Sequence, residues 1–225
     1  MTRIRSQMAG NSRASLAFYS LGRFLTVGLV AGLWNRISVE GAEHVPTEGA
    51  FILAPVHRSN MDTPYAAATT RRRLRFMGKD SLWKTKPAAW LLSALGGFPV
   101  TRGTADREAL QRCLEVLAGG EPLVVFPEGE RKSGPVVQPL FEGAAYLAAK
   151  AGVPIVPVGI GGSERAMAKG ARFIRPSKVV VVVGEPVRVP AEPGVRVPRP
   201  AMRAVTEQLH EDLQRLFDTA QIRAG

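Results

Sequence analysis

A histidine followed five residues later by an aspartate is the pair in this chain best suited to acid–base chemistry. His57 comes directly after the apolar run 50–56, and Asp62 lies where a helix is expected to begin. A turn between them would bring the carboxylate to one imidazole nitrogen. That contact fixes the tautomer, stabilises the imidazolium and leaves the other nitrogen free as a base. The H-x4-D spacing is a weak pattern by itself, so His57 and Asp62 need support from the rest of the chain.

Two further segments place charged groups next to predicted strands. The segment FPEGER, residues 126–131, follows an apolar run, and the segment GFPVTR, residues 97–102, ends at Arg102. The proline and glycine of FPEGER favour a sharp turn. The planar guanidinium group of Arg131 offers a donor fork that suits a phosphate. A charged turn in solvent is the competing interpretation of the same residues.

These residues are positioned by strands and helices that alternate along the chain. The predicted strands cover residues 37–39, 50–56, 74–78, 98–101, 123–126, 155–160 and 179–183. The predicted helices cover residues 62–70, 88–95, 106–118 and 140–150. A last amphipathic helix carries the apolar stripe Met202, Val205, Leu209, Leu213 and Leu216, after a proline-rich connector at 186–200. This order predicts an α/β fold with a largely parallel central sheet flanked by helices, whose ligands bind at the carboxyl ends of the strands.

The N-terminal segment, residues 1–35, has its own character. It holds four arginines and no acidic residue, and it ends in an apolar run at 24–35. Arg23 interrupts the roughly 20 apolar residues that a transmembrane helix needs, and residues 30–32 make a poor signal-peptide cleavage site. We expect an amphipathic helix over about 12–34 that lies at a membrane surface, with arginines at lipid phosphates and apolar side chains in the acyl region. An organellar transit peptide and an ordinary helix packed on the core are the alternatives.

Composition limits the classes of function. Thirty Lys and Arg against nineteen Asp and Glu give the 225-residue chain a net charge of +11, which favours nucleic acid, anionic membrane or phosphorylated substrates. A mean hydropathy of +0.01 is high for such a charged chain and favours the membrane. The single cysteine, Cys113, excludes an internal disulfide and indicates a reducing compartment. No set of residues has the spacing of a metal site.

A basic cluster near the C-terminal third could also meet phosphates. It consists of Arg165, Lys169, Arg172, Arg175 and Lys178. The cluster could contact the phosphates of coenzyme A or a lipid surface, or it could simply be a solvated basic face.

Taken in order, four motifs resemble the glycerolipid acyltransferase family and its PlsC-like 1-acylglycerol-3-phosphate O-acyltransferases. They are His57-x4-Asp62, GFPVTR, FPEGER and VPIVPV at 153–158. Each is modest alone, but four in this order over about 36–185 are specific. The resemblance implies an acyltransferase domain over 36–225. It would move a fatty acyl group from an acyl thioester to the free hydroxyl of 1-acylglycerol 3-phosphate, giving phosphatidic acid.

The resemblance also assigns roles to residues. His57 would be the catalytic base and Asp62 its partner. The positions that would hold the phosphate of the acceptor are Arg102, Glu128, Gly129 and Arg131, with Lys79 as a further basic position. The co-substrate would be acyl-CoA or an acyl carrier protein thioester, whose activated acyl group needs no enzyme nucleophile, and no cofactor or metal is expected. The partners would be a lysophospholipid acceptor and an anionic membrane surface, at the cytoplasmic face of the cell membrane, and not nucleic acid.

Two positions depart from the pattern of the family. Val56 stands where asparagine usually precedes the histidine, and Glu130 stands where threonine or serine usually follows the glycine of FPEG. Glu130 adds a negative charge where a phosphate is expected. It either points away, or the acceptor is glycerol 3-phosphate or another lysolipid. A non-catalytic membrane-binding module and a nucleic-acid-binding protein are the rivals from other classes, although no nucleic-acid-binding motif is apparent.

Overall fold

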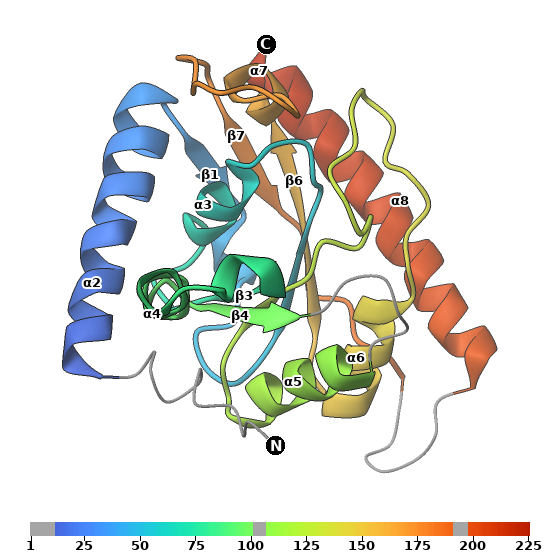
Figure 1. Ribbon diagram of the computed structural model, residues 1–225. Coiled ribbons are helices and arrows are strands. Elements are labelled where there is room, and N and C mark those ends of the chain that lie inside the picture. The colour runs from blue at the N-terminus through green and yellow to red at the C-terminus, as the bar shows by residue number, and fades with distance from the viewer. Residues whose placement is uncertain (1–11, 101–106, 191–197) are drawn as a thin grey trace.

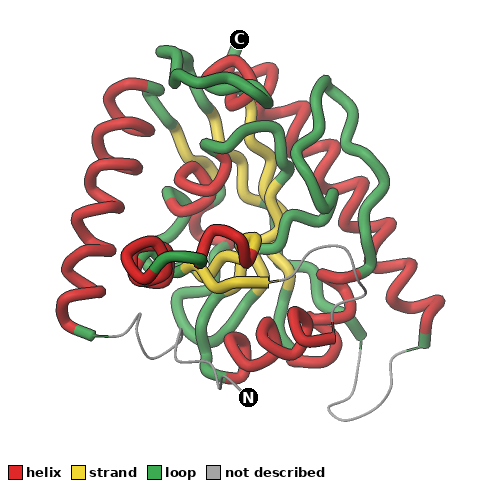
Figure 2. The backbone as a smooth tube through the Cα atoms, viewed as in Figure 1, coloured by secondary structure: helices red, strands yellow, loops and turns green. Residues whose placement is uncertain are grey.

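Strands and helices alternate in the computed structural model, which describes residues 12–100, 107–190 and 198–225 (Figures 1 and 2). The strands are β1 Ser38–Glu40, β2 Ile52–Pro55, β3 Arg75–Lys79, β4 Gly97–Val100, β5 Leu123–Val124, β6 Ile155–Gly161 and β7 Val180–Val183. The main helices are α2 Arg13–Arg23, η1 Phe24–Trp34, α3 Asp62–Ala67, α4 Lys86–Ala94, α5 Arg107–Ala118, α6 Gly143–Ala151, α7 Ser163–Ala166 and α8 Arg199–Ala224. Two short 3-10 turns, η2 Ala42–His44 and η3 Asp80–Trp83, complete the described elements.

The strands form one sheet in the order β1-β7-β6-β2-β5-β3-β4. Neighbouring strands pair parallel except β6 and β7, which pair antiparallel. Strands β2 and β6 are buried along their whole length, because helices cover both faces of the sheet. Helices α5, α6 and α8 lie over one face, and α3, α4 and the N-terminal helix over the other (Figure 1). The predicted α/β class and largely parallel sheet are confirmed.

Two glycines of β6 let α8 approach the sheet very closely. A Cβ atom on Gly159 would stand 2.3 Å from the backbone carbon of Leu216, and one on Gly161 would stand 2.2 Å from that of Ala220. The predicted last helix is therefore held with its backbone against the strand. It is also longer than expected, because Pro200 is tolerated in its first turn. Its predicted stripe is buried from Val205 onward.

The N-terminal helix is continuous over Arg13–Trp34, close to the predicted 12–34, and its second half is wound as a π-helix. With 22 residues and a mean hydropathy of 1.6, it is long and apolar enough to cross a membrane. The expectation that Arg23 would cut the apolar stretch too short was therefore wrong. Only Ser15 and Ala31 are buried, so the helix touches the domain along a narrow side. Its large exposed apolar side chains are Leu16, Leu21, Phe24, Leu25, Leu29, Leu33 and Trp34.

Two side chains of this helix, which were expected to face lipid, contact the domain instead. Arg23 turns toward the domain and donates a hydrogen bond from Nη1 to the carbonyl of Ala67, rather than facing outward. The Phe18 ring packs against Trp90 of α4, with 5.2 Å between the ring centroids. Both contacts fix the position of the helix relative to α3 and α4.

Candidate active site

His57 and Asp62 come together as the sequence predicted. His57 lies two residues beyond the end of β2, and Asp62 is the first residue of α3. The imidazole Nδ1 lies 3.0 Å from Asp62 Oδ2; the Asp62 side chain is fully buried, whereas that of His57 is 17% exposed. With Nδ1 as the donor to the carboxylate, Nε2 carries the free lone pair. This is the geometry that a general base requires.

The Asp62 carboxylate is held rigidly by the turn that precedes it. Its Oδ2 atom also accepts hydrogen bonds from the backbone N–H groups of Arg58 and Ser59, each at 2.6 Å. Three donors therefore converge on one oxygen. The five-residue spacing between His57 and Asp62 is explained by this turn, which closes the chain around the carboxylate.

Phe126, the first residue of FPEGER, packs against the face of the His57 imidazole. The rings of His57 and Phe126 stack with centroids 3.9 Å apart and planes inclined by 20°. Asp62 fixes one ring nitrogen, and Phe126 fixes the ring plane. From sequence, Phe126 was expected only to end a strand, although its place at the start of FPEGER was a signal for a role in the site.

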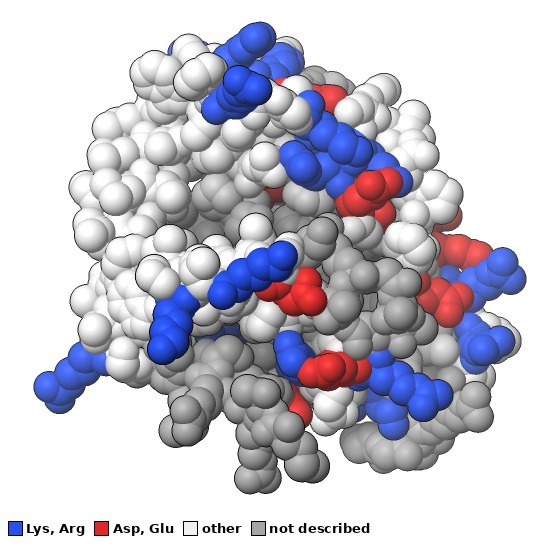
Figure 3. Space-filling model, viewed as in Figure 1, with Lys and Arg blue, Asp and Glu red and all other residues white. Residues whose placement is uncertain are grey.

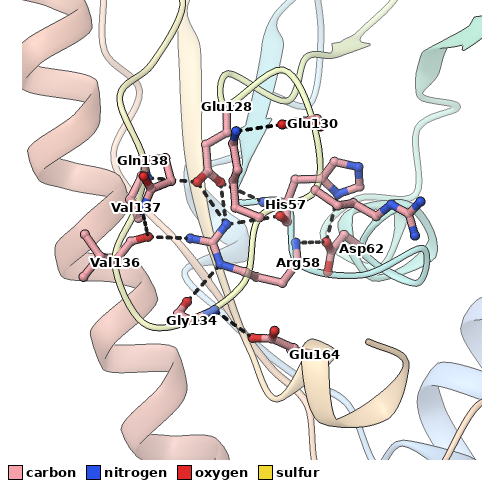
Figure 4. A network of polar contacts seen from close by, with 12 residues as sticks. His57, Arg58, Asp62, Glu128, Glu130, Gly134, Val136, Val137, Gln138 and Glu164 are labelled. Carbon is pink, nitrogen blue, oxygen red and sulfur yellow. Dashed lines mark hydrogen bonds and ion pairs between the residues drawn. The ribbon is translucent and has the colours of Figure 1, made fainter. Parts of the chain in front are cut away.

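A buried ion pair joins the two loops that form the site. Arg58 Nη1 lies 2.9 and 2.8 Å from the two carboxylate oxygens of Glu128, and both side chains are almost inaccessible to solvent. Glu128 also accepts the backbone N–H groups of His57, at 3.1 Å, and Gln138, at 3.0 Å (Figure 4). Because its acceptors are used by the protein, the structure places Glu128 as a positioning residue under the His57 loop. Its predicted contact with the acceptor stays a prediction.

Each nitrogen of the Arg58 guanidinium group donates at least one hydrogen bond to the protein. The group donates to the carbonyls of His57, Gly134 and Val136 in addition to Glu128 (Figure 4). Its Cζ atom lies 4.9 Å from the ring centroid of Phe217 on α8. Buried charges are tolerated only with such complete pairing. Sequence reasoning missed Arg58; the signal available was a charged residue directly after the histidine.

The turn of FPEGER depends on Gly129. This residue has φ of +75°, which favours glycine, and its N–H donates to the carbonyl of Phe126 at 3.0 Å. A Cβ atom here would stand 2.6 Å from the Phe141 ring. Gly129 therefore shapes the loop, and its predicted contact with the acceptor stays a prediction.

Glu130, the unusual residue of the motif, is neutralised by neighbouring lysines. Its carboxylate lies 2.9 Å from Lys132 Nζ and 4.0 Å from Lys169 Nζ. The hydrogen bond from Lys132 is the main cause that lowers the pKa of Glu130. The guanidinium group of Arg131 has no hydrogen bond or ion pair within the described part of the chain. The loop therefore keeps a free cation next to a carboxylate that is already paired.

The remaining predicted residues are placed only in part. Lys79 ends β3 and is paired in register with Val100 of β4, and its side chain lies outside the described part. Arg102 lies outside the described residues altogether. The VPIVPV motif runs into β6, where Ile155, Val156 and Val158 are fully buried. Its visible role is to pack the central strand beside β2.

Comparison with known proteins identifies the class that this fold and site define. Residues 36–161, more than half of the chain, match the family model described as Acyltransferase. The chain belongs to the acyltransferase family.

Individual relatives are similar over most of this chain. A chloroplastic 1-acyl-sn-glycerol-3-phosphate acyltransferase of Brassica napus is 27% identical over 170 residues, which are 70% of this chain and 49% of the relative. The 1-acyl-sn-glycerol-3-phosphate acyltransferase of Bacillus subtilis is 24% identical over 189 residues, which are 84% of this chain and 92% of the relative. The chain thus spans about half the length of its plant relatives but nearly all of the bacterial one.

A solved structure has the same architecture. The crystal structure of the 1-acyl-sn-glycerophosphate acyltransferase PlsC from Thermotoga maritima superimposes with a TM-score of 0.71 at 27% sequence identity. The match covers 93% of this chain and 85% of that one. The structural match therefore extends beyond the residues that the family model matches.

Proposed function

We propose that this protein transfers a fatty acyl group from an acyl thioester to the free hydroxyl of 1-acylglycerol 3-phosphate, giving phosphatidic acid and a free thiol. The observation that carries the proposal is the His57–Asp62 pair, which leaves Nε2 outside the contact with Asp62, beside the FPEGER loop. The Lys132 N–H of that loop donates to the His57 carbonyl at 2.8 Å, and the Arg131 guanidinium group has no partner among the described residues. Membership of the acyltransferase family and the names of the relatives support the same reaction.

The proposed mechanism needs one base and no enzyme nucleophile. His57 Nε2 takes the proton of the acceptor hydroxyl while the hydroxyl oxygen attacks the carbonyl carbon of the thioester. A carbon–oxygen bond forms, the carbon–sulfur bond breaks, and the imidazolium returns the proton to the leaving thiolate. Asp62, held by two backbone N–H groups, stabilises the imidazolium between these steps. Cys113 is not a competing nucleophile, because burial raises the pKa of its thiol to about 12.

Electrostatics near the site favour an anionic acceptor. Arg131, Lys132 and Lys169 supply three cations around the one carboxylate of Glu130. Two positive charges remain after that carboxylate is balanced, so Glu130 does not rule out a phosphate. Arg131 would hold the phosphate, with Arg102, Lys79 and the Glu128–Gly129 turn contributing as the resemblance implies. Acyl-CoA or an acyl carrier protein thioester would serve as co-substrate, without a cofactor or metal.

The site would work at a membrane, at the cytoplasmic face of the cell membrane. The exposed apolar side of the N-terminal helix supports association with a membrane. An apolar cavity of about 200 Å³ lies between this helix and α3, and Thr63 and Pro64, the residues after Asp62, line it. We propose that an acyl chain lies toward this cavity, so that the reacting groups stay near His57.

A thiol-release assay tests the proposed function. The protein is mixed with an acyl thioester, with and without 1-acylglycerol 3-phosphate, and released thiol and lipid product are measured together. Acceptor-dependent thiol release that yields phosphatidic acid, and that the His57→Ala variant lacks, is the expected result. A panel with glycerol 3-phosphate and other lysolipids identifies the preferred acceptor. Absence of release with every acceptor and both donor types would contradict the proposal and favour a non-catalytic membrane or nucleic-acid binder.

A further inference from the structure

The loop that follows α7, residues 167–178, combines exposed cations with an exposed aromatic ring. It contains Lys169, Arg172, Arg175 and Lys178 and no acidic residue. Phe173, between two of the arginines, is 81% exposed. A solvated basic loop gains nothing from a phenylalanine in water, whereas a loop that enters a membrane interface gains the burial of that ring.

The predicted basic cluster divides into cations with internal partners and cations without. Lys178 donates to the carbonyl of Arg223, and Arg165 to that of Ala224, so both bind the C-terminal end of α8. Lys169 contacts Glu130. The guanidinium groups of Arg172 and Arg175 have no hydrogen bond or ion pair in the described part of the chain. These two arginines are therefore available to an external anion.

This loop is attached to the exposed end of the N-terminal helix. The indole Nε1 of Trp34 donates to the carbonyl of Ile174 at 3.1 Å, and Asn35 Nδ2 donates to the carbonyl of Arg175 at 2.9 Å. Trp34 is 52% exposed and Leu33 74%. The loop and this helix end lie side by side in Figure 1. Figure 3 shows a largely uncharged surface over α2 and α4, with Lys and Arg at its edges.

The loop 167–178 is also attached to the turn between His57 and Asp62 and to the FPEGER loop. The hydroxyl of Ser59, between His57 and Asp62, donates to the carbonyl of Met167 at 2.7 Å. Lys169 Nζ donates to the carbonyl of Arg131 at 3.5 Å. A contact made at Phe173 is thus held at a fixed position relative to the site.

We infer that Leu33, Trp34, Arg172, Phe173 and Arg175 form one docking surface for an anionic lipid bilayer. The three apolar side chains enter the interface, and the two arginines meet lipid phosphates. The inference rests on the proposed function insofar as the docked site would receive its acceptor from the bilayer. The loop 167–178 thus adds a membrane contact to that of the N-terminal helix, and the two contacts together fix the orientation of the site.

Sedimentation with vesicles tests the docking surface without any substrate. The vesicles are equimolar phosphatidylcholine and phosphatidylglycerol, or phosphatidylcholine alone. The docking variants are Phe173→Ser and Arg172→Gln/Arg175→Gln. The matched control, Lys150→Gln/Arg188→Gln, removes two exposed charges at the opposite end of the sheet, where Ile155 pairs with Val187. Thermal unfolding verifies that each variant is folded.

The two kinds of docking variant should differ in their salt dependence. Losing two arginines should weaken binding to anionic vesicles about 25-fold at low salt, since each basic residue at such a surface contributes about fivefold. This loss should shrink at high salt. Phe173→Ser should weaken binding roughly tenfold at either salt concentration, because burial of the ring is not screened. The control should bind like the wild type.

Each other outcome contradicts the inference. Docking variants that sediment like the control would show that the surface does not meet lipid. A raised KM for soluble acyl-CoA or acyl carrier protein, with unchanged vesicle binding, would assign Arg172 and Arg175 to the donor. Sedimentation needs no turnover. A protein that binds vesicles but lacks activity would contradict only the proposed reaction, and an active protein whose docking variants bind normally would contradict only the docking surface.

Discussion

The loops that carry His57 and FPEGER lie close to the proposed docking surface, but the two regions meet opposite physical requirements. In the loops around His57, the charged side chains of Arg58 and Glu128 are buried and are satisfied entirely by protein atoms. At the proposed docking surface, apolar side chains face solvent, and two arginines have no side-chain partner among the described residues. The buried pair is complete by itself, whereas the proposed docking surface is complete only against an external partner. Changes in the first should therefore alter turnover or stability, and changes in the second should alter membrane binding without altering stability.

The largest effect is expected at His57. A positioned base contributes about 10²–10⁴-fold in rate, so His57→Ala should lower turnover by at least that range. Asp62→Asn should also be severe, because the amide cannot stabilise the imidazolium. Vesicle binding should be unchanged in both variants. Product formation and sedimentation measured on the same preparations check this, and near-wild-type turnover in folded His57→Ala would contradict the mechanism.

Removing Glu128 should cost the protein stability. Glu128→Leu leaves the Arg58 guanidinium group buried without its carboxylate, which costs about 3–5 kcal/mol. The double variant Arg58→Met/Glu128→Leu should recover much of this loss, because no unpaired charge remains. Urea unfolding measures both free energies.

The pair of Arg75 and Glu121 provides a matched control for that experiment. Its atoms are 2.6 Å apart, but the Glu121 side chain is 31% exposed, so Glu121→Leu should cost less. If Glu128→Leu kept wild-type stability and lost activity only on phosphorylated acceptors, Glu128 would contact the acceptor, as the resemblance implies.

A smaller effect is expected at Arg131, which is half-buried in the FPEGER loop. A hydrogen bond to a charged group contributes roughly 1.5–3 kcal/mol. Arg131→Ala should therefore lower kcat/KM for phosphorylated acceptors by about 10–100-fold. Stability should change little because the side chain has no ion pair with any of the residues that the structure describes. An equal loss with a phosphate-free acceptor would assign Arg131 a structural role instead.

The contrast between the two regions also explains what could be predicted from sequence. The apolar runs of β2 and β6 predicted a buried parallel sheet, and His57 and Asp62 were found because a local turn joins them. The Arg58–Glu128 pair was missed because its partners are 70 residues apart. Its effect depends on a strand order that no local pattern encodes.

Errors at the N-terminal helix have a different cause. Its length was predicted well, because the apolar run is local. The direction of Arg23 was not, because it depends on the carbonyl of Ala67, which packing of α3 places nearby. Likewise, the lysine partners of Glu130 include Lys169 on a distant loop. Local periodicity predicts elements, but not which polar groups meet between them.

The smallest effect on the fold is expected at Leu33, and it separates the two regions most directly. Leu33 is 74% exposed, so Leu33→Ser should change the free energy of unfolding by no more than about 0.5 kcal/mol. Vesicle binding should nevertheless weaken roughly tenfold, because a buried leucine side chain contributes about 1.5–3 kcal/mol. Urea unfolding and sedimentation, compared with Leu53→Ser in fully buried β2, check both parts. Leu53→Ser should destabilise the protein strongly. If Leu33→Ser also destabilised the protein without changing vesicle binding, the helix end would be packing on the domain rather than docking on a membrane.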